Sequence, residues 1–188
     1  MTVQRPIPLS APVIAHDRAN LVALPIIGCL VLAGLAGLVD TLLVTKAFIL
    51  YIVADFFWIL LEPRAVPSKP RFILWHHAVT FLLLQIPLKH PQLGQYTCWD
   101  GLVEWNTLFL IARRQCGANS RAFKLFNAAY WVSFYPVRVL LFPALLPLFW
   151  REMQNGYAWW ETAAVMATQA SLVVFNAWFL VASWMRKR

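Results

Sequence analysis

Residues 72–88 read Phe-Ile-Leu-Trp-His-His-Ala-Val-Thr-Phe-Leu-Leu-Leu-Gln-Ile-Pro-Leu, an apolar run that holds the adjacent histidines His76 and His77. A helix crosses a bilayer with about 17–25 mostly apolar residues, so this run is long enough to span one. Ionisable side chains at membrane depth are costly, and each one marks a candidate functional site. The stretch therefore predicts a membrane helix that carries two imidazoles.

The whole chain has the composition of a membrane protein. Its 188 residues are 61% hydrophobic and 13% charged, with a mean hydropathy of +0.62, whereas soluble domains carry about 25% charged residues. The formal net charge is +8, but the basic residues lie between apolar runs, which excludes a nucleic-acid-binding module. The cysteines Cys29, Cys98 and Cys116 have no paired spacing, so neither a disulfide framework nor a cysteine metal site is predicted.

The hydropathy pattern divides the chain into six segments that can each cross a bilayer. They are 21–39, 41–61, 72–88, 98–112, 123–150 and 157–184. The expected fold class is all-α, a polytopic bundle of six transmembrane helices in residues 21–185 between a tail at 1–20 and a basic tail at 186–188. Pro136, Pro143 and Pro147 are expected to kink or break the fifth segment. The first segment has an alternative interpretation as a signal peptide, although its leader and apolar run are long for one.

Lys and Arg residues outside these segments are distributed unevenly. The two tails and the connections 62–71 and 113–122 hold most of them, and the opposite side holds only Lys89 and Arg151. Because cytoplasmic loops are enriched in Lys and Arg, both termini are expected to lie in the cytosol.

Polar side chains of four segments are predicted to meet in the cytosolic half of the bundle. With a rise of about 1.5 Å per helical residue, they fall at similar depths. They are Asp55, His76, His77, Glu104 and Asn176. Tyr51 and Thr107 each share a helix face with the acidic residue of their segment, so one polar cavity is predicted. Arg138 lies deeper, and Asp100 is its expected charge partner.

Five motifs occur along the chain in an order that resembles that of a known family. They are Tyr51-Ile-Val-Ala-Asp55, Pro70 with His76–His77, Glu104-Trp-Asn-Thr-Leu-Phe-Leu-Ile-Ala-Arg-Arg114, Phe134-Tyr-Pro-Val-Arg138 and Asn176-Ala-Trp178. This set, from about residue 46 to 184, resembles the TLC-domain membrane proteins, which include the ceramide synthases. The resemblance implies residence in the endoplasmic reticulum and a role in lipid or sphingolipid metabolism. It also implies a lipid-facing polar cavity lined by Tyr51, Thr107, Arg138, Asn176 and Trp178.

Ceramide synthases transfer an acyl group from acyl-CoA to a sphingoid amine and carry two aspartates one helix after the His pair. Glu104 and Thr107 stand at those positions here, which is similar to the non-synthase branch of the family, and an alternative alignment uses Asp100. In an acyltransferase, His76 or His77 would act as base or acyl acceptor, and Glu104 or Asp55 would orient the imidazole. Acyl-CoA would then be a co-substrate, and no bound cofactor is implied.

Two other interpretations of the polar residues remain open. They can form a buried hydrogen-bond network that ties helices together in a protein that binds lipids or membrane partners without turnover. Two histidines with carboxylates can also ligate a metal, although adjacent histidines diverge on a helix. We expect a protein that handles membrane lipids, with acyl transfer as the alternative, no metal and no nucleic-acid partner. The sequence leaves the oligomeric state open.

Overall fold

The computed structural model describes residues 9–154 and 156–185, and all regular secondary structure in them is helical. The α-helices are α1 (Ala11–Leu35), α2 (Thr41–Leu61), α3 (Pro70–Lys89), α4 (Gly94–Gly101), α5 (Val103–Gln115), α6 (Arg121–Phe134), α7 (Phe142–Met153) and α8 (Trp159–Met185). Short 3₁₀ turns cover Pro63–Ala65 and Pro91–Leu93. Five helical stretches are long and apolar enough to cross a membrane, so the predicted all-α polytopic bundle is confirmed.

The first helix begins earlier than predicted. Helix α1 starts at Ala11 with Pro12 in its first turn, a position where the missing proline N–H costs nothing. Residues 11–20 therefore belong to the bundle and not to a tail. The polar residues of this stretch, His16, Asp17 and Asn20, are all buried. The predicted basic tail at 186–188 and the first eight residues of the predicted amino-terminal tail lie outside the described residues.

The fourth predicted span, 98–112, is not one helix. It divides at Leu102 into α4 and α5, and neither part is long enough to cross a membrane alone. The fifth predicted span shows the opposite behaviour, since residues 121–153 stay helical through all three prolines. A π-helical segment, Tyr135–Leu141, follows α6 directly and holds Pro136 in its first turn. The wider π-turn accommodates Pro136, which has no N–H to donate, and the chain stays helical.

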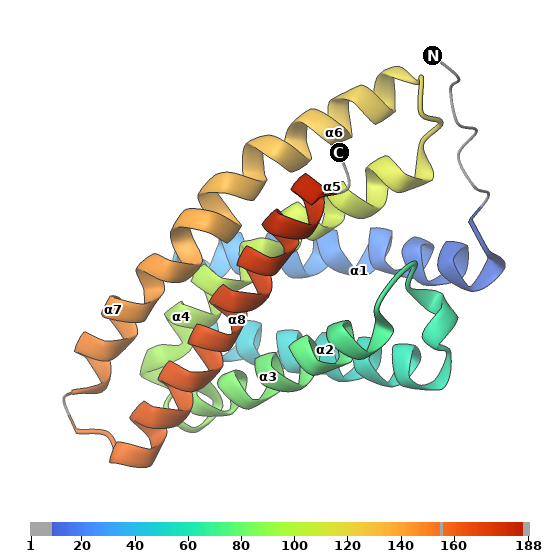
Figure 1. Ribbon diagram of the computed structural model, residues 1–188. Coiled ribbons are helices and arrows are strands. Elements are labelled where there is room, and N and C mark those ends of the chain that lie inside the picture. The colour runs from blue at the N-terminus through green and yellow to red at the C-terminus, as the bar shows by residue number, and fades with distance from the viewer. Residues whose placement is uncertain (1–8, 155, 186–188) are drawn as a thin grey trace.

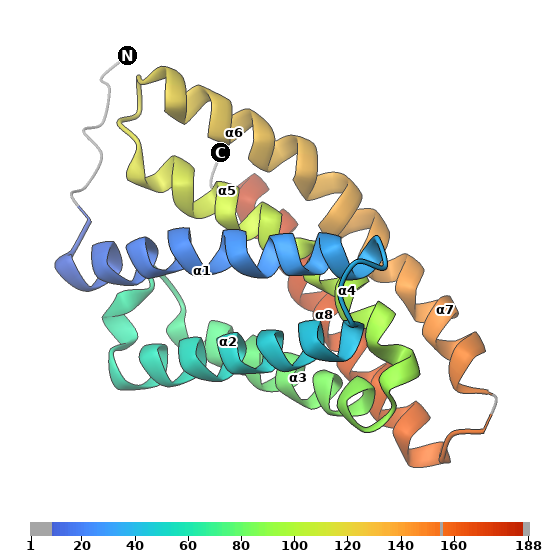
Figure 2. The same ribbon diagram turned by 180° about the vertical axis from the view of Figure 1, so that it is seen from behind.

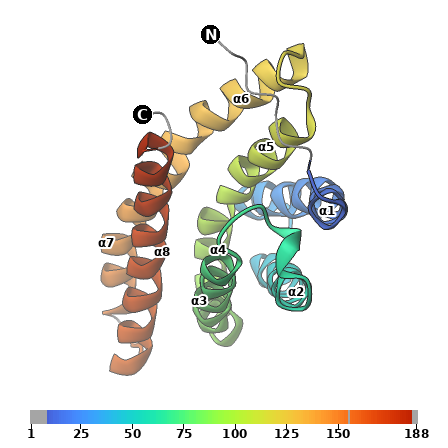
Figure 3. The ribbon, with the colours of Figure 1, turned by 45° about the vertical axis from the view of Figure 1, so that its right-hand side comes forward.

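The helices form three layers, which Figure 3 shows from one side. Helices α1 and α2 make one outer layer, α3 to α5 the middle layer, and α7 and α8 the other outer layer. Seen from behind, α1 lies along α5 and beside α2 (Figure 2). Helices α1 and α5 approach closely at Gly28, where a Cβ atom would stand only 2.7 Å from the Trp105 ring. Small residues at such crossings are how membrane helices gain van der Waals contact.

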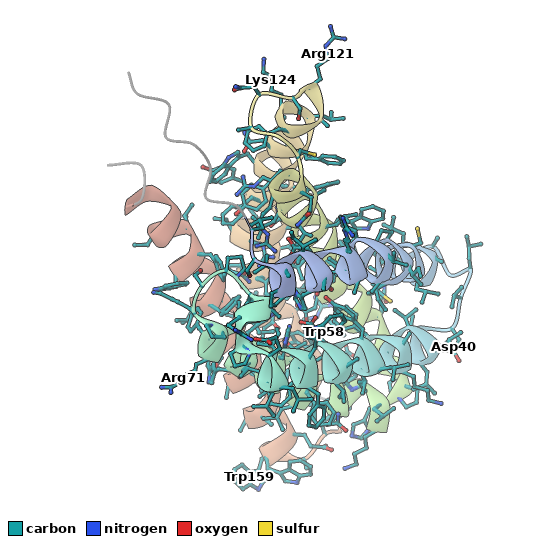
Figure 4. The ribbon with its side chains drawn as sticks, turned by 90° about the vertical axis from the view of Figure 1, so that its right-hand side faces the viewer. Asp40, Trp58, Arg71, Arg121, Lys124 and Trp159 are labelled. Carbon is teal, nitrogen blue, oxygen red and sulfur yellow. The ribbon has the colours of Figure 1, made fainter. Side chains whose placement is uncertain are left out.

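The connections gather at two opposite ends of the bundle. The α2–α3 and α5–α6 connections lie at one end, and the α7–α8 connection lies at the other (Figure 1). Arg121 and Lys124 project from the first of these ends, far from Trp159 at the start of α8 (Figure 4). In the α2–α3 connection, Arg64 donates two hydrogen bonds to Glu62, which hold the pKa of that carboxyl below its usual range.

Candidate functional site

A cavity of about 670 Å³ lies at the end of the bundle that carries the α2–α3 connection. Helices α1, α2, α3, α5, α6 and α8 all contribute to its lining, together with Val66, Pro67 and Ser68 of that connection. Its volume is in the range of about 300–1,000 Å³ that small-molecule pockets occupy. Its lining has two parts, a polar wall built from charged and polar groups and an apolar wall built from aromatic and aliphatic side chains, and the two meet where His76 stacks on Phe175.

The polar wall is centred on the carboxylate of Asp55, which is 8% exposed. His16 Nε2 lies 2.7 Å from Asp55 Oδ1, and Asn20 donates to the same oxygen at 3.2 Å. His77 Nε2 lies 3.5 Å from the other oxygen, Oδ2. Tyr51 donates its hydroxyl proton to Asn20 Oδ1 at 2.9 Å and completes the network. One carboxylate thus holds two imidazoles from different helices.

Both histidines of the predicted pair line the cavity. The Nδ1 atoms of His76 and His77 are buried and have no hydrogen-bond partner among the described residues. The His76 ring stacks on Phe175, with centroids 4.1 Å apart and planes 11° apart. Buried polar atoms are almost always paired in folded proteins, so these two nitrogens are exceptions.

Arg138 forms a second polar cluster at the same cavity. It donates from Nε to Asn106 Oδ1 at 2.7 Å, from Nη1 to Asn176 Oδ1 at 2.8 Å and from Nη2 to Thr107 Oγ1 at 2.9 Å. The predicted pair of Arg138 with Asp100 is therefore wrong. Asp100 instead accepts a hydrogen bond from Gln169 at 3.2 Å, because it precedes the break at Leu102 that separates α4 from α5.

The apolar wall comes from α5, α6 and α8. Its larger side chains are Leu110, Ile111, Phe123, Trp131, Phe134, Phe175 and Phe179. An amphipathic molecule can lie in such a cavity with its polar group against the histidines and its chain against the aromatic rings.

The structure brings most of the predicted site residues together. Those that line the cavity are Tyr51, Asp55, His76, His77, Glu104, Thr107 and Arg138. Asn176 lies behind the lining and reaches it through Arg138. Trp178 does not line the cavity, because its ring packs against Phe72 at 4.5 Å, with the ammonium group of Lys69 over it at 4.0 Å.

Sequence reasoning missed three members of the site, His16, Asn20 and Asn106. The first two were assigned to a tail, although their spacing of four residues and the preceding Pro12 are signals of a helix that starts before residue 21. Asn106 was quoted within a motif but received no role. It accepts from Arg138 and donates to the Tyr130 carbonyl at 2.8 Å, so it joins α5 to α6.

A metal interpretation gains no support from this geometry. Within residues 9–154 and 156–185, no group of three His, Cys, Asp or Glu side chains is arranged to hold a metal ion. Asp55 is already occupied by imidazole and amide donors.

The fold and the cavity together define a polytopic all-α membrane protein with a polar and aromatic pocket between its helices. No protein-family model, curated protein or solved structure matches the chain.

Proposed function

We propose that the protein handles membrane lipids and binds an amphipathic lipid in the cavity between α3, α5, α6 and α8. The observation that carries the proposal is that one cavity is lined both by polar groups, among them Asp55, His76 and Arg138, and by aromatic rings. The ordered motifs that resemble TLC-domain proteins support the same function, because thirteen of their residues line this cavity.

A substitution that fills the cavity tests this proposal. Leu110→Trp places an indole in the apolar wall, and we expect it to reduce the lipid that copurifies with the protein by about tenfold, since a lost chain contact of 1–2 kcal/mol has that effect. Val132→Trp is the matched control, because Val132 is 75% exposed on the outer face of α6. Native mass spectrometry of both variants measures the bound lipid. Equal lipid occupancy in wild type and Leu110→Trp would contradict the proposal.

A second candidate function is acyl transfer from acyl-CoA to an amine. It is favoured by His77, whose Nε2 faces the Asp55 carboxylate while its Nδ1 has no partner. In this reaction His77 takes the proton of the attacking amine, the C–N bond forms as the thioester C–S bond breaks, and the proton passes to the leaving CoA thiolate. A carboxylate that orients a neutral imidazole is the arrangement that general base catalysis requires.

Acyl transfer predicts a product that depends on His77. We expect His77→Ala to lower the rate of labelled amide formation by about 10²-fold or more, since general acid–base catalysis contributes about 10²–10⁴-fold. His90→Ala is the control, because His90 pairs with Glu161 at the other end of α3. Microsomes are incubated with labelled acyl-CoA, and lipid products are followed by mass spectrometry at equal protein expression. A wild type that forms no amide across a broad panel of amines would eliminate this candidate.

We also propose residence in the endoplasmic reticulum with both termini in the cytosol. The resemblance to TLC-domain proteins supports the compartment, and the excess of Lys and Arg at the end of the bundle where Arg121 and Lys124 project supports the orientation. Epitope tags at both termini should bind antibody after selective permeabilisation of the plasma membrane. A tag that needs full permeabilisation would reverse the orientation.

A further inference from the structure

Arg138 is a buried cation whose hydrogen-bond partners are all neutral. It is 9% exposed and donates to two amide oxygens and one hydroxyl. Among the described residues, no carboxylate forms an ion pair with it. A guanidinium carries five N–H groups, and these bonds use three of them. Burying an unpaired charge is costly, so a site that keeps one is suited to a ligand of opposite charge.

The acidic residues nearest to Arg138 do not contact it. Glu104 interacts with Arg138 only at a distance, and Asp55 is engaged by His16 and Asn20. Arg114 is held by Asp17, whereas Arg113 bonds only to the Asn127 amide oxygen and lies over the Tyr130 ring. Arg113 and Arg138 thus both line the cavity, and no carboxylate of the described residues contacts either of them.

The backbone and the apolar wall position Arg138 for such a ligand. It lies in the π-helical segment Tyr135–Leu141, and π-turns within helices occur frequently at functional sites. Phe134, one turn earlier, and Phe175 and Phe179 of α8 line the same cavity. An alkyl chain against these rings would leave its head group beside the guanidinium.

We infer that the cavity selects an amphiphile with one alkyl chain and an anionic head group, a carboxylate or a phosphate, which Arg138 binds. This inference rests on the proposed lipid-binding function and adds the charge of the ligand to it. The planar guanidinium accommodates either head group through paired N–H donors. Glu104 opposes the same ligand by repulsion, and its removal is expected to strengthen binding.

Binding of matched amphiphiles tests the inference. The purified protein in phosphatidylcholine nanodiscs is titrated with palmitate, hexadecanol, hexadecylamine and palmitoyl lysophosphatidic acid, with empty nanodiscs as the blank. Acetate and inorganic phosphate test the head groups without a chain. We expect palmitate or the lysophosphatidic acid to bind about tenfold or more tighter than hexadecanol, and the free anions to bind far more weakly.

Variants assign the effect to Arg138. Arg138→Gln should weaken binding of the anionic amphiphiles by about tenfold or more and leave hexadecanol unchanged. Glu104→Gln should strengthen anion binding, so it decides the question if Arg138→Gln does not fold. Arg64→Gln is the control, because that side chain is 79% exposed in the α2–α3 connection.

The outcomes separate this inference from the proposed function. Hexadecanol or hexadecylamine binding as tightly as palmitate, or a Glu104→Gln protein with unchanged palmitate affinity, would overturn the anionic ligand while lipid binding stands. If acetate or phosphate bound as tightly as palmitate or the lysophosphatidic acid, the requirement for an alkyl chain would be overturned. Failure of every probe to bind would contradict the proposed function itself.

Discussion

Replacement of Asp55 by alanine is expected to lower the free energy of unfolding by about 3–5 kcal/mol, the range for removal of one partner from a buried charged cluster. The loss is large because one carboxylate serves three helices. It accepts from His16 and Asn20 of α1, and His77 of α3 lies 3.5 Å from its other oxygen. In Asp55→Ala, all three side chains lose their common partner.

Conservative and control variants sharpen this test. Asp55→Asn keeps an acceptor oxygen but not the charge, so a smaller loss of about 1–2 kcal/mol is expected. Thr168→Ala is the control, because Thr168 is only half-buried and its hydrogen bonds go to carbonyls of its own helix, α8. Unfolding in detergent, followed by tryptophan fluorescence, measures all three variants. A loss below about 1 kcal/mol for Asp55→Ala would show that the cluster does not hold α1, since single membrane hydrogen bonds average about that much or less.

Asp17→Ala is expected to have an effect of similar size, about 3–5 kcal/mol, for a different reason. Asp17 is fully buried and accepts from both Nε and Nη2 of Arg114, and from the Gln115 amide. This bidentate pair attaches the start of α1 to the end of α5. Arg114 also lines the cavity, so the same substitution should weaken lipid binding.

The matched control for Asp17 is an exposed pair of the same chemistry. Glu62 accepts two hydrogen bonds from Arg64 at 2.8 and 3.0 Å, but both residues lie in the α2–α3 connection. Glu62→Ala should leave stability unchanged within error, because solvent-exposed ion pairs contribute little. A double-mutant cycle of Asp17→Ala with Arg114→Ala measures the coupling directly. Equal effects of Asp17→Ala and Glu62→Ala would refute the assignment of α1 to the bundle by this contact.

The amino-terminal part of the chain illustrates where prediction from sequence fails. His16, Asp17 and Asn20 lower the hydropathy of residues 11–20, so a hydropathy criterion places the start of the span after them. Their partners, Asp55 and Arg114, are 39 and 97 residues away along the chain. Burial of these polar groups is acceptable only because the partners satisfy them, and no local pattern reveals a partner so distant.

Helix breaks show the same limitation. Prolines at 136, 143 and 147 predict a break in the fifth span, but the π-helical segment keeps that span helical. The helix break at Leu102 has no nearby proline that would predict it. The Arg138–Asp100 pair failed for this reason, since the break directs Asp100 toward α8 and leaves Asn106 and Thr107 of α5 facing Arg138.

Hydropathy and charge alone determined that this is a polytopic helical membrane protein, because each span must satisfy its own backbone hydrogen bonds and does so within a contiguous apolar run. The depth of Asp55, His77 and Glu104 along their spans also followed from a constant rise per residue. Only the tertiary structure decided which side chains are partnered. Pairing across helices depends on rotation and on contacts between distant segments, and those contacts bring His16 to Asp55 and leave Arg138 without an anion.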